Sequence, residues 1–116
     1  MKSIEEKREK RLKYKRRITL LTGKQRSYLK GLANTIKPIT QIGKQGITEN
    51  FIHQLEEALE ARELVKVHVL ENSLMNAKEA ASEVVQLTGA EFVQAIGNKF
   101  VIYRRSKENP KIHFPH

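Results

Sequence analysis

Two glycines bracket a lysine and a glutamine in the segment Gly43-Lys44-Gln45-Gly46. Glycine adopts backbone conformations that other residues avoid, and it lets a bound group approach the main chain closely. The segment leads into a predicted helix, whose first N–H groups lack partners within the helix and whose dipole favours an anion. Lys44 adds a mobile positive charge. This pattern could bind a phosphate group; the plain alternative is a turn in which the glycines serve geometry alone.

The charge around this segment also favours an anionic partner. The chain has 22 Lys and Arg residues against 13 acids, all of them glutamate, for a net charge of +9. Residues 1–17 hold nine basic and three acidic residues, residues 18–48 hold five basic residues and no acid, and residues 49–87 hold eight glutamates against three basic residues. Such asymmetry is typical of a basic face that binds a polyanion. The bland alternative is a soluble protein with a high pI.

The residues needed for catalysis are largely missing. The chain has no cysteine, which excludes a disulfide framework, a cysteine zinc site and a cysteine nucleophile. It also has no aspartate, and the largest group of its glutamates lies along the outer face of one predicted helix. Three serines have no evident histidine partner, and the four histidines lack metal-ligand spacing (Ser27, Ser73, Ser82; His53, His68, His113, His116). We therefore expect a binding protein without a cofactor rather than an enzyme.

The length of 116 residues suits one domain. No apolar run reaches membrane-spanning length, and no secretory pattern opens the sequence. The expectation is a cytoplasmic, monomeric protein with no membrane partner.

The elements that would hold the glycine segment can be read from capping residues and periodicity. Residues 1–17 have almost no apolar content and form a predicted basic arm. Thr22 with Gln25 fits a capping box, and the helix that follows ends before Pro38. Residues 39–42 then form a short predicted strand. On the helix, Lys24, Arg26 and Lys30 fall largely off the apolar stripe and so face water.

The second half of the chain continues the alternation of helices and strands. Thr48 caps a predicted helix that ends near Arg62 and carries glutamates on its outer face, which we interpret as a solvated face. A half-buried strand at 64–70 and a third helix follow, with Asn72 and Ser73 as candidate caps and Gly89 as its end. Residues 91–105 read as a hairpin around the turn Gly97-Asn98.

The resulting order is helix, strand, helix, strand, helix, strand, strand. Helical crossovers allow the first strands to pair in parallel, whereas the hairpin is antiparallel. The predicted fold class is α/β (α+β), a four-stranded mixed sheet packed with three helices. The predicted divisions are a basic arm at 1–20, one domain at 21–105 and an irregular tail at 106–116.

Three separated blocks of the sequence resemble one family. The blocks are "LTGKQRSYLKGLANTIKPITQIGKQGIT" at 21–48, "EALEARELVKV" at 57–67 and "TGAEFVQAIGNKFVIYRR" at 88–105. In this order they resemble the CRM domain (chloroplast RNA splicing and ribosome maturation), and most of all its bacterial single-domain, YhbY-like members. The glycine segment is similar to the GXXG loop that clamps a nucleic-acid backbone in KH domains.

The resemblance implies a fold like that of the C-terminal domain of translation initiation factor three. It also implies RNA binding, and association with precursors of the large ribosomal subunit. The family's motif falls on Gly43, Lys44, Gln45 and Gly46, and its basic helix positions and Lys-Pro step fall on Lys24, Arg26, Lys30, Lys37 and Pro38. Where many relatives carry a histidine before the Lys-Pro step, this chain has Asn34, Thr35 and Ile36, so a contact made by that histidine does not carry over.

The function predicted from the sequence is therefore RNA binding, with ribosomal RNA in large-subunit precursors as the partner. The GXXG residues and the basic helix would form the surface, and Arg104 and Arg105 would extend it. Two alternatives remain: a nonspecific DNA-binding protein, and a protein-interaction module that uses the glutamate-rich second helix.

Overall fold

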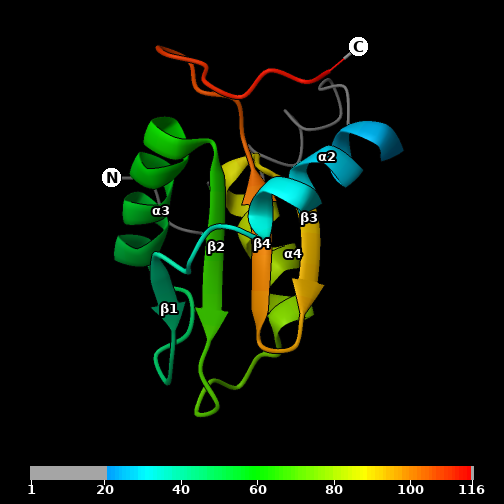
Figure 1. Ribbon diagram of the computed structural model, residues 1–116. Helices are drawn as coiled ribbons and strands as arrows, with labels where there is room; N and C mark the ends of the chain where they lie inside the picture. Colours follow the sequence, from blue (N-terminus) through cyan, green and yellow to red (C-terminus); the bar gives the residue numbers. More distant parts are fainter. Residues whose placement is uncertain (1–20, 116) are drawn as a thin grey trace.

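The structure, a computed structural model, describes residues 21–115. The predicted basic arm at 1–20 and His116 lie outside the described residues. In chain order, the elements are α2 (Gly23–Ala33), β1 (Thr40–Ile42), α3 (Glu49–Arg62), β2 (Leu64–Val69), α4 (Ala77–Thr88), β3 (Glu91–Ile96) and β4 (Lys99–Tyr103). Figure 1 shows α2 in front of the sheet and α4 behind it. The predicted order of helices and strands is confirmed.

The four strands form one mixed sheet in the order β1-β2-β4-β3. β1 pairs in parallel with β2, with Thr40 opposite Val67, and β4 runs antiparallel to both of its neighbours. The predicted parallel pair and the predicted hairpin are therefore both confirmed. Because β1 ends where the GXXG segment begins, its pairing with β2 fixes the start of that loop.

Both faces of the sheet carry a hydrophobic cluster. Consecutive side chains of β2 point to opposite faces, so Leu64 and Val65 belong to different clusters. Val65, Val67 and Val69 pack with residues of α3 and α4. Leu64 packs on the other face with Leu29 of α2 and with Ile112 near the end of the chain. The sheet is thus the middle layer of the molecule.

The helix starts show how far local signals determine the boundaries. The predicted capping box between Thr22 and Gln25 is present, and Thr48 caps α3 by accepting from the backbone N–H of Phe51 at 3.0 Å. The predicted start of the third helix is wrong. Asn76 caps α4 in a capping box with Glu79, whereas residues 72 and 73 lie in the preceding turn. Gly89 ends α4 with a φ of 75°, as predicted.

The hairpin contains an irregularity that its sequence did not indicate. Gly97 has a φ of 60°, which suits glycine as the first residue of the predicted turn. The register between β3 and β4 shifts between Phe92 and Gln94. Such a bulge leaves a residue outside the ladder. Here that residue is Val93, and the carbonyl of the preceding Phe92 accepts a hydrogen bond from Nε of Arg26 at 3.2 Å, which ties α2 to β3.

Residues 104–115, here called the C-terminal segment, contain no helix or strand, as the predicted irregular tail requires. The segment is nevertheless attached to the end of α3 by two carboxylates. Glu60 accepts hydrogen bonds from the hydroxyl of Ser106 and the backbone N–H groups of Lys107 and Glu108. Glu60 is half-exposed and makes these contacts from the predicted outer face, whereas the predicted solvated face is wrong for Glu63, which is buried.

Glu63 holds the same segment from a buried position. Its side chain is 0 % exposed, and its carboxylate accepts from the backbone N–H groups of Ser106, Lys111 and Ile112 at 2.7–2.9 Å. It follows α3 with a φ of 66°, which is uncommon for a residue other than glycine. Its carbonyl also accepts from the N–H of Arg104 at 2.9 Å. One residue thus ends a helix and anchors the C-terminal segment.

Aromatic contacts complete this attachment. The ring of Phe114 lies edge-on to Tyr28 of α2, with 6.0 Å between ring centroids, and edge-on to Tyr103 of β4 at 5.7 Å. Such pairs stabilise beyond the area that they bury. The C-terminal segment therefore belongs to the packed domain, although it lies beyond the boundary at 105 that the sequence predicts.

Candidate nucleic-acid interface

The GXXG segment forms a tight turn between β1 and α3. The N–H of Gly46 donates to the carbonyl of Gly43 at 3.0 Å, and Gly46 has a φ of 71°. Lys44 and Gln45 at the tip are exposed, and Figure 1 shows the loop extending beyond the end of β1. A positive φ is strained for residues with a Cβ atom, so Gly46 is needed for the turn itself. The turn presents a cation and an amide side chain to solvent.

Gly43, in contrast, is not required by the space around it, because a Cβ atom there would meet the segment that follows β2 at ordinary van der Waals distances. A Cβ atom at this position would lie 3.4 Å from Cδ1 of Leu70 and 3.5 Å from Oδ1 of Asn72. The N–H of Leu70 donates to the carbonyl of Ile42 at 2.8 Å, which extends the β1–β2 pairing to the foot of the loop. The base of the loop is therefore held firmly while its tip remains accessible.

The helix start behind the loop is less available to an anion than the sequence pattern indicates. The side chain of Thr48 already accepts from the N–H of Phe51, and Glu49 places an acid in the first turn of α3. Both groups satisfy the positive end of the helix dipole. A phosphate at this loop would therefore depend mainly on Lys44 and on the turn rather than on the helix dipole.

The predicted basic residues of α2 divide into two kinds. Lys24 and Lys30 are exposed, and so is Lys37 in the connection from α2 to β1. Arg26 is half-buried and uses its Nε to bind the carbonyl of Phe92. The three lysines are therefore open to an anionic partner, whereas Arg26 has a structural contact in addition.

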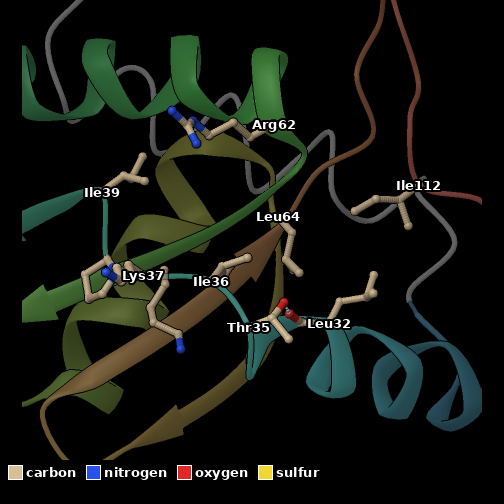
Figure 2. A pocket seen from close by; sticks show the side chains of 10 residues that line it. Leu32, Thr35, Ile36, Lys37, Ile39, Arg62, Leu64 and Ile112 are labelled. Carbon is tan, nitrogen blue, oxygen red and sulfur yellow. Dashed lines mark hydrogen bonds between the residues drawn. The ribbon is translucent and has the colours of Figure 1, made fainter.

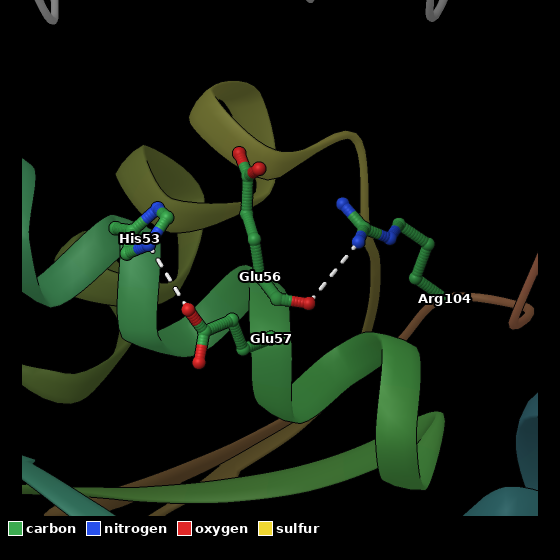
Figure 3. A network of polar contacts seen from close by, with 4 residues as sticks. All are labelled: His53, Glu56, Glu57 and Arg104. Atoms are coloured by element: carbon green, nitrogen blue, oxygen red, sulfur yellow. Dashed lines mark hydrogen bonds and ion pairs between the residues drawn. The ribbon is translucent and has the colours of Figure 1, made fainter.

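The two predicted arginines after β4 also differ from each other. Arg105 is exposed. Arg104 is half-buried, and its guanidinium donates from Nη1 to the carbonyl of Thr88 at 2.8 Å and from Nη2 to the carbonyl of Glu56 at 3.3 Å. Figure 3 shows the second of these bonds beside an exposed pair, His53 and Glu57, at 2.9 Å. These contacts favour a structural role for Arg104 between the middle of α3 and the end of α4, and a nucleic-acid contact there stays a prediction.

Two cations that are not among the predicted site residues line the same hollow as Lys37. Arg62 at the end of α3 and Lys66 of β2 line one hollow together with it. The alternation of β2 placed Lys66 away from the valine face, which was the available signal. That Arg62 would lie beside it depends on the packing of α3, which no local pattern reveals.

The carboxylates that hold the C-terminal segment titrate at unusually low pH. Burial alone would raise the pKa of Glu63, but the backbone N–H groups of Ser106, Ile112 and Lys111 outweigh it and lower that pKa. The backbone N–H groups of Lys107 and Glu108, followed by the Ser106 hydroxyl, lower the pKa of Glu60 to about 2. Hydrogen bonds to a charged carboxylate favour its ionised form. Both carboxylates are therefore ionised at neutral pH.

The described chain offers few features of other site classes. Among residues 21–115, no group of three or more His, Cys, Asp or Glu side chains is placed to hold a metal ion. In the same part of the chain, no helix is long and apolar enough to cross a membrane.

The fold and the loop together define a small α+β protein with a basic glycine turn between its first strand and the following helix. Residues 21–104 match the model of the CRS1 / YhbY (CRM) domain family. The chain belongs to this family, which confirms the resemblance drawn from the three sequence blocks.

Individual relatives match nearly the same region. The chain is 46% identical to the probable RNA-binding protein YqeI of Bacillus subtilis, over 83% of this chain and 100% of YqeI. It is 38% identical to an RNA-binding protein of Haemophilus influenzae, over 84% of this chain and 98% of that protein. The solution structure of the hypothetical protein SAV1595 from Staphylococcus aureus superposes with a TM-score of 0.70 at 54% identity, covering 83% of this chain and 100% of that one. This neighbour confirms the predicted fold.

Proposed function

We propose that this protein binds RNA, and that its partner is ribosomal RNA in precursors of the large ribosomal subunit. The observation that carries the proposal is the exposed Lys44-Gln45 tip on a firmly held glycine turn. The exposed Lys24, Lys30 and Lys37 belong to the same acid-free stretch of sequence. Support also comes from the relatives, which are named RNA-binding proteins. The ribosomal partner rests on the family resemblance.

The loop is tested by reversing its charge. Replacing both Lys44 and Gln45 with Asp places anions where a phosphate would sit, and neither side chain contributes to the core. We expect the affinity for structured ribosomal RNA to fall by about 1.5–3 kcal/mol, the scale of charge-assisted hydrogen bonds. Binding is measured by filter retention or fluorescence anisotropy, with folding checked by circular dichroism.

A matched control separates the loop from the total charge. Replacing Lys78 and Ser82 of α4 with Asp changes the net charge by the same amount, at exposed positions on a helix that packs on the opposite face from α2. The control should weaken binding much less. Equal losses in the two folded variants would mean that only the overall charge matters, and no loss in the loop variant would defeat the phosphate clamp.

The ribosomal partner needs a separate experiment. Crosslinking in cells, followed by sequencing of the bound RNA, should recover fragments of large-subunit ribosomal RNA. Recovery of messenger or transfer RNA without such enrichment would contradict this part of the proposal and leave RNA binding intact.

Of the alternatives, the protein-interaction module has less surface available than the sequence indicates. Glu60 and Glu63, at the end of the glutamate-rich helix, already bind the chain's own C-terminal segment. No observation of the structure favours this alternative, or DNA binding, over RNA.

A further inference from the structure

A hollow of about 480 Å³ lies beside the connection between α2 and β1. Figure 2 shows its labelled side chains, which come from the end of α2 and the following connection, the end of α3, the start of β2 and the C-terminal segment. The lining residues are Leu32, Thr35, Ile36, Lys37, Pro38, Ile39, Arg62, Leu64, Lys66 and Ile112. Three separate parts of the chain, residues 32–39, residues 62–66 and Ile112, thus meet around one concave surface.

The hollow combines apolar and cationic groups. Its apolar lining includes Ile36, Leu64 and Ile112, and Ile39 leaves 39 % of its surface exposed. An exposed apolar surface next to polar groups is typical of a binding site. Lys37, Arg62 and Lys66 supply the charge, and none of the described lining residues is acidic. The chemistry that fits is a flat apolar ring joined to negative charge.

A nucleotide has this chemistry, and Lys37 links the hollow to the proposed RNA surface. Along the chain, the lining residues 32–39 follow the basic helix α2 and precede the GXXG loop. Lys37 belongs both to the hollow and to the proposed RNA surface. An arginine guanidinium can stack on a base, and bases in unpaired RNA are accessible to such pockets.

We propose that the hollow receives one unpaired base of the bound RNA, while Lys37, Arg62 and Lys66 contact the flanking phosphates. This inference rests on the proposed RNA-binding function and adds a contact of a different kind. The GXXG loop would hold backbone of any sequence, whereas the hollow contacts the base itself. The proposed ligand is a strand of RNA, and the first test below distinguishes it from a free nucleotide.

The first test follows methyl groups by NMR in the full chain. The probes are an unpaired ten-nucleotide RNA, an abasic ribose-phosphate oligomer of the same length, and the four nucleoside monophosphates. We expect the RNA to shift the methyl signals of Ile36, Ile39 and Ile112, and the abasic oligomer to shift them far less. Equal shifts with the two oligomers would overturn the base contact, and saturation by a monophosphate at the concentration needed for RNA would overturn the strand as the ligand.

The second test separates base from phosphate with two variants. Ile39→Ser removes an exposed apolar contact, so the fold should survive. It should weaken RNA binding about fivefold and leave binding of the abasic oligomer unchanged. The double variant Arg62→Ala with Lys66→Ala should weaken binding of both the RNA and the abasic oligomer about tenfold. The control, Lys78→Ala with Lys107→Ala, removes two exposed charges outside the hollow and should change either affinity less than threefold.

The outcomes distinguish this inference from the proposed function. Suppose that both folded hollow variants bind RNA normally, while the Lys44 and Gln45 variant loses RNA affinity. This result would overturn the proposed base contact in the hollow and leave the proposed RNA-binding function standing. Failure of the wild-type chain to bind RNA at all would overturn both.

Discussion

At the scale of single residues, the side-chain contacts of Glu63 offset the cost of its unfavourable positive φ. A positive φ costs a residue with a Cβ atom of the order of 1 kcal/mol or more. Glycine would avoid that cost, but it could not accept the hydrogen bonds from Ser106, Lys111 and Ile112. The glutamate is therefore used here for its buried carboxylate, and the turn conformation is tolerated.

Removing only the charge tests this role. Glu63→Gln keeps the shape of the side chain but weakens the acceptor and introduces a buried NH₂ group that faces N–H donors. We expect the free energy of unfolding to fall by about 1.5–3 kcal/mol, the scale for hydrogen bonds to a charged group. Urea denaturation measures the change. The matched control is Glu57→Gln, whose side chain is 70 % exposed, and a loss of equal size there would contradict the assigned role.

At the scale of elements, the C-terminal segment and α3 form a unit whose stability depends on pH. The folded-state pKa of Glu60 is about 2 and that of Glu63 is also lowered, whereas an unfolded glutamate titrates near 4.3. Unfolding then takes up protons as the pH falls. The stabilisation is complete well above pH 4.3 and disappears as the pH falls through the folded-state values.

We therefore expect the free energy of unfolding to decrease between about pH 5 and pH 2. In the double variant Glu60→Gln with Glu63→Gln, the free energy of unfolding should depend less on pH over that range, because these two groups no longer titrate. Denaturation at several pH values measures both curves. Parallel curves for the two proteins would mean that other carboxylates cause the acid sensitivity.

Prediction from sequence succeeded where the deciding interactions are local. The capping box of Thr22 and Gln25 joins residues only three positions apart, and the sequence predicts it. The same motif at Asn76 and Glu79 was missed because Asn72 and Ser73 offered earlier caps. The contacts of Glu63 join residues 43 to 49 positions apart, and no periodicity signals such a distance.

The same distinction applies to the candidate site. The GXXG turn could be predicted because two glycines at fixed spacing restrict the local backbone. The hollow could not, because Lys37, Arg62 and Ile112 come together only after the sheet and both of its faces are packed.

At the scale of the whole molecule, the proposed RNA surface is mainly electrostatic. Residues 21–48 contain five basic residues and no acid, and few aromatic side chains are exposed in the described part of the chain. Neutralisation of roughly five phosphates on single-stranded RNA would give a slope of about −3.5 in a plot of log affinity against log salt concentration. RNA titrations at salt concentrations between about 50 and 300 mM measure this slope. A slope near zero would mean that the basic surface does not bind the RNA.

The anchoring of the C-terminal segment to Glu63 also has a consequence for the order in which the chain is expected to fold. Pairing of β2 with β4 brings the N–H of Arg104 to the carbonyl of Glu63, and only then does a short loop suffice to bring residues 106–112 to the carboxylate. We therefore expect the segment to dock after β2 and β4 have paired. Since Ile112 forms part of the hollow, a chain that has not docked this segment has the GXXG loop but an incomplete hollow. If folding follows this order, the GXXG loop would form before the hollow is complete, and the two proposed RNA contacts would arise at different stages of folding.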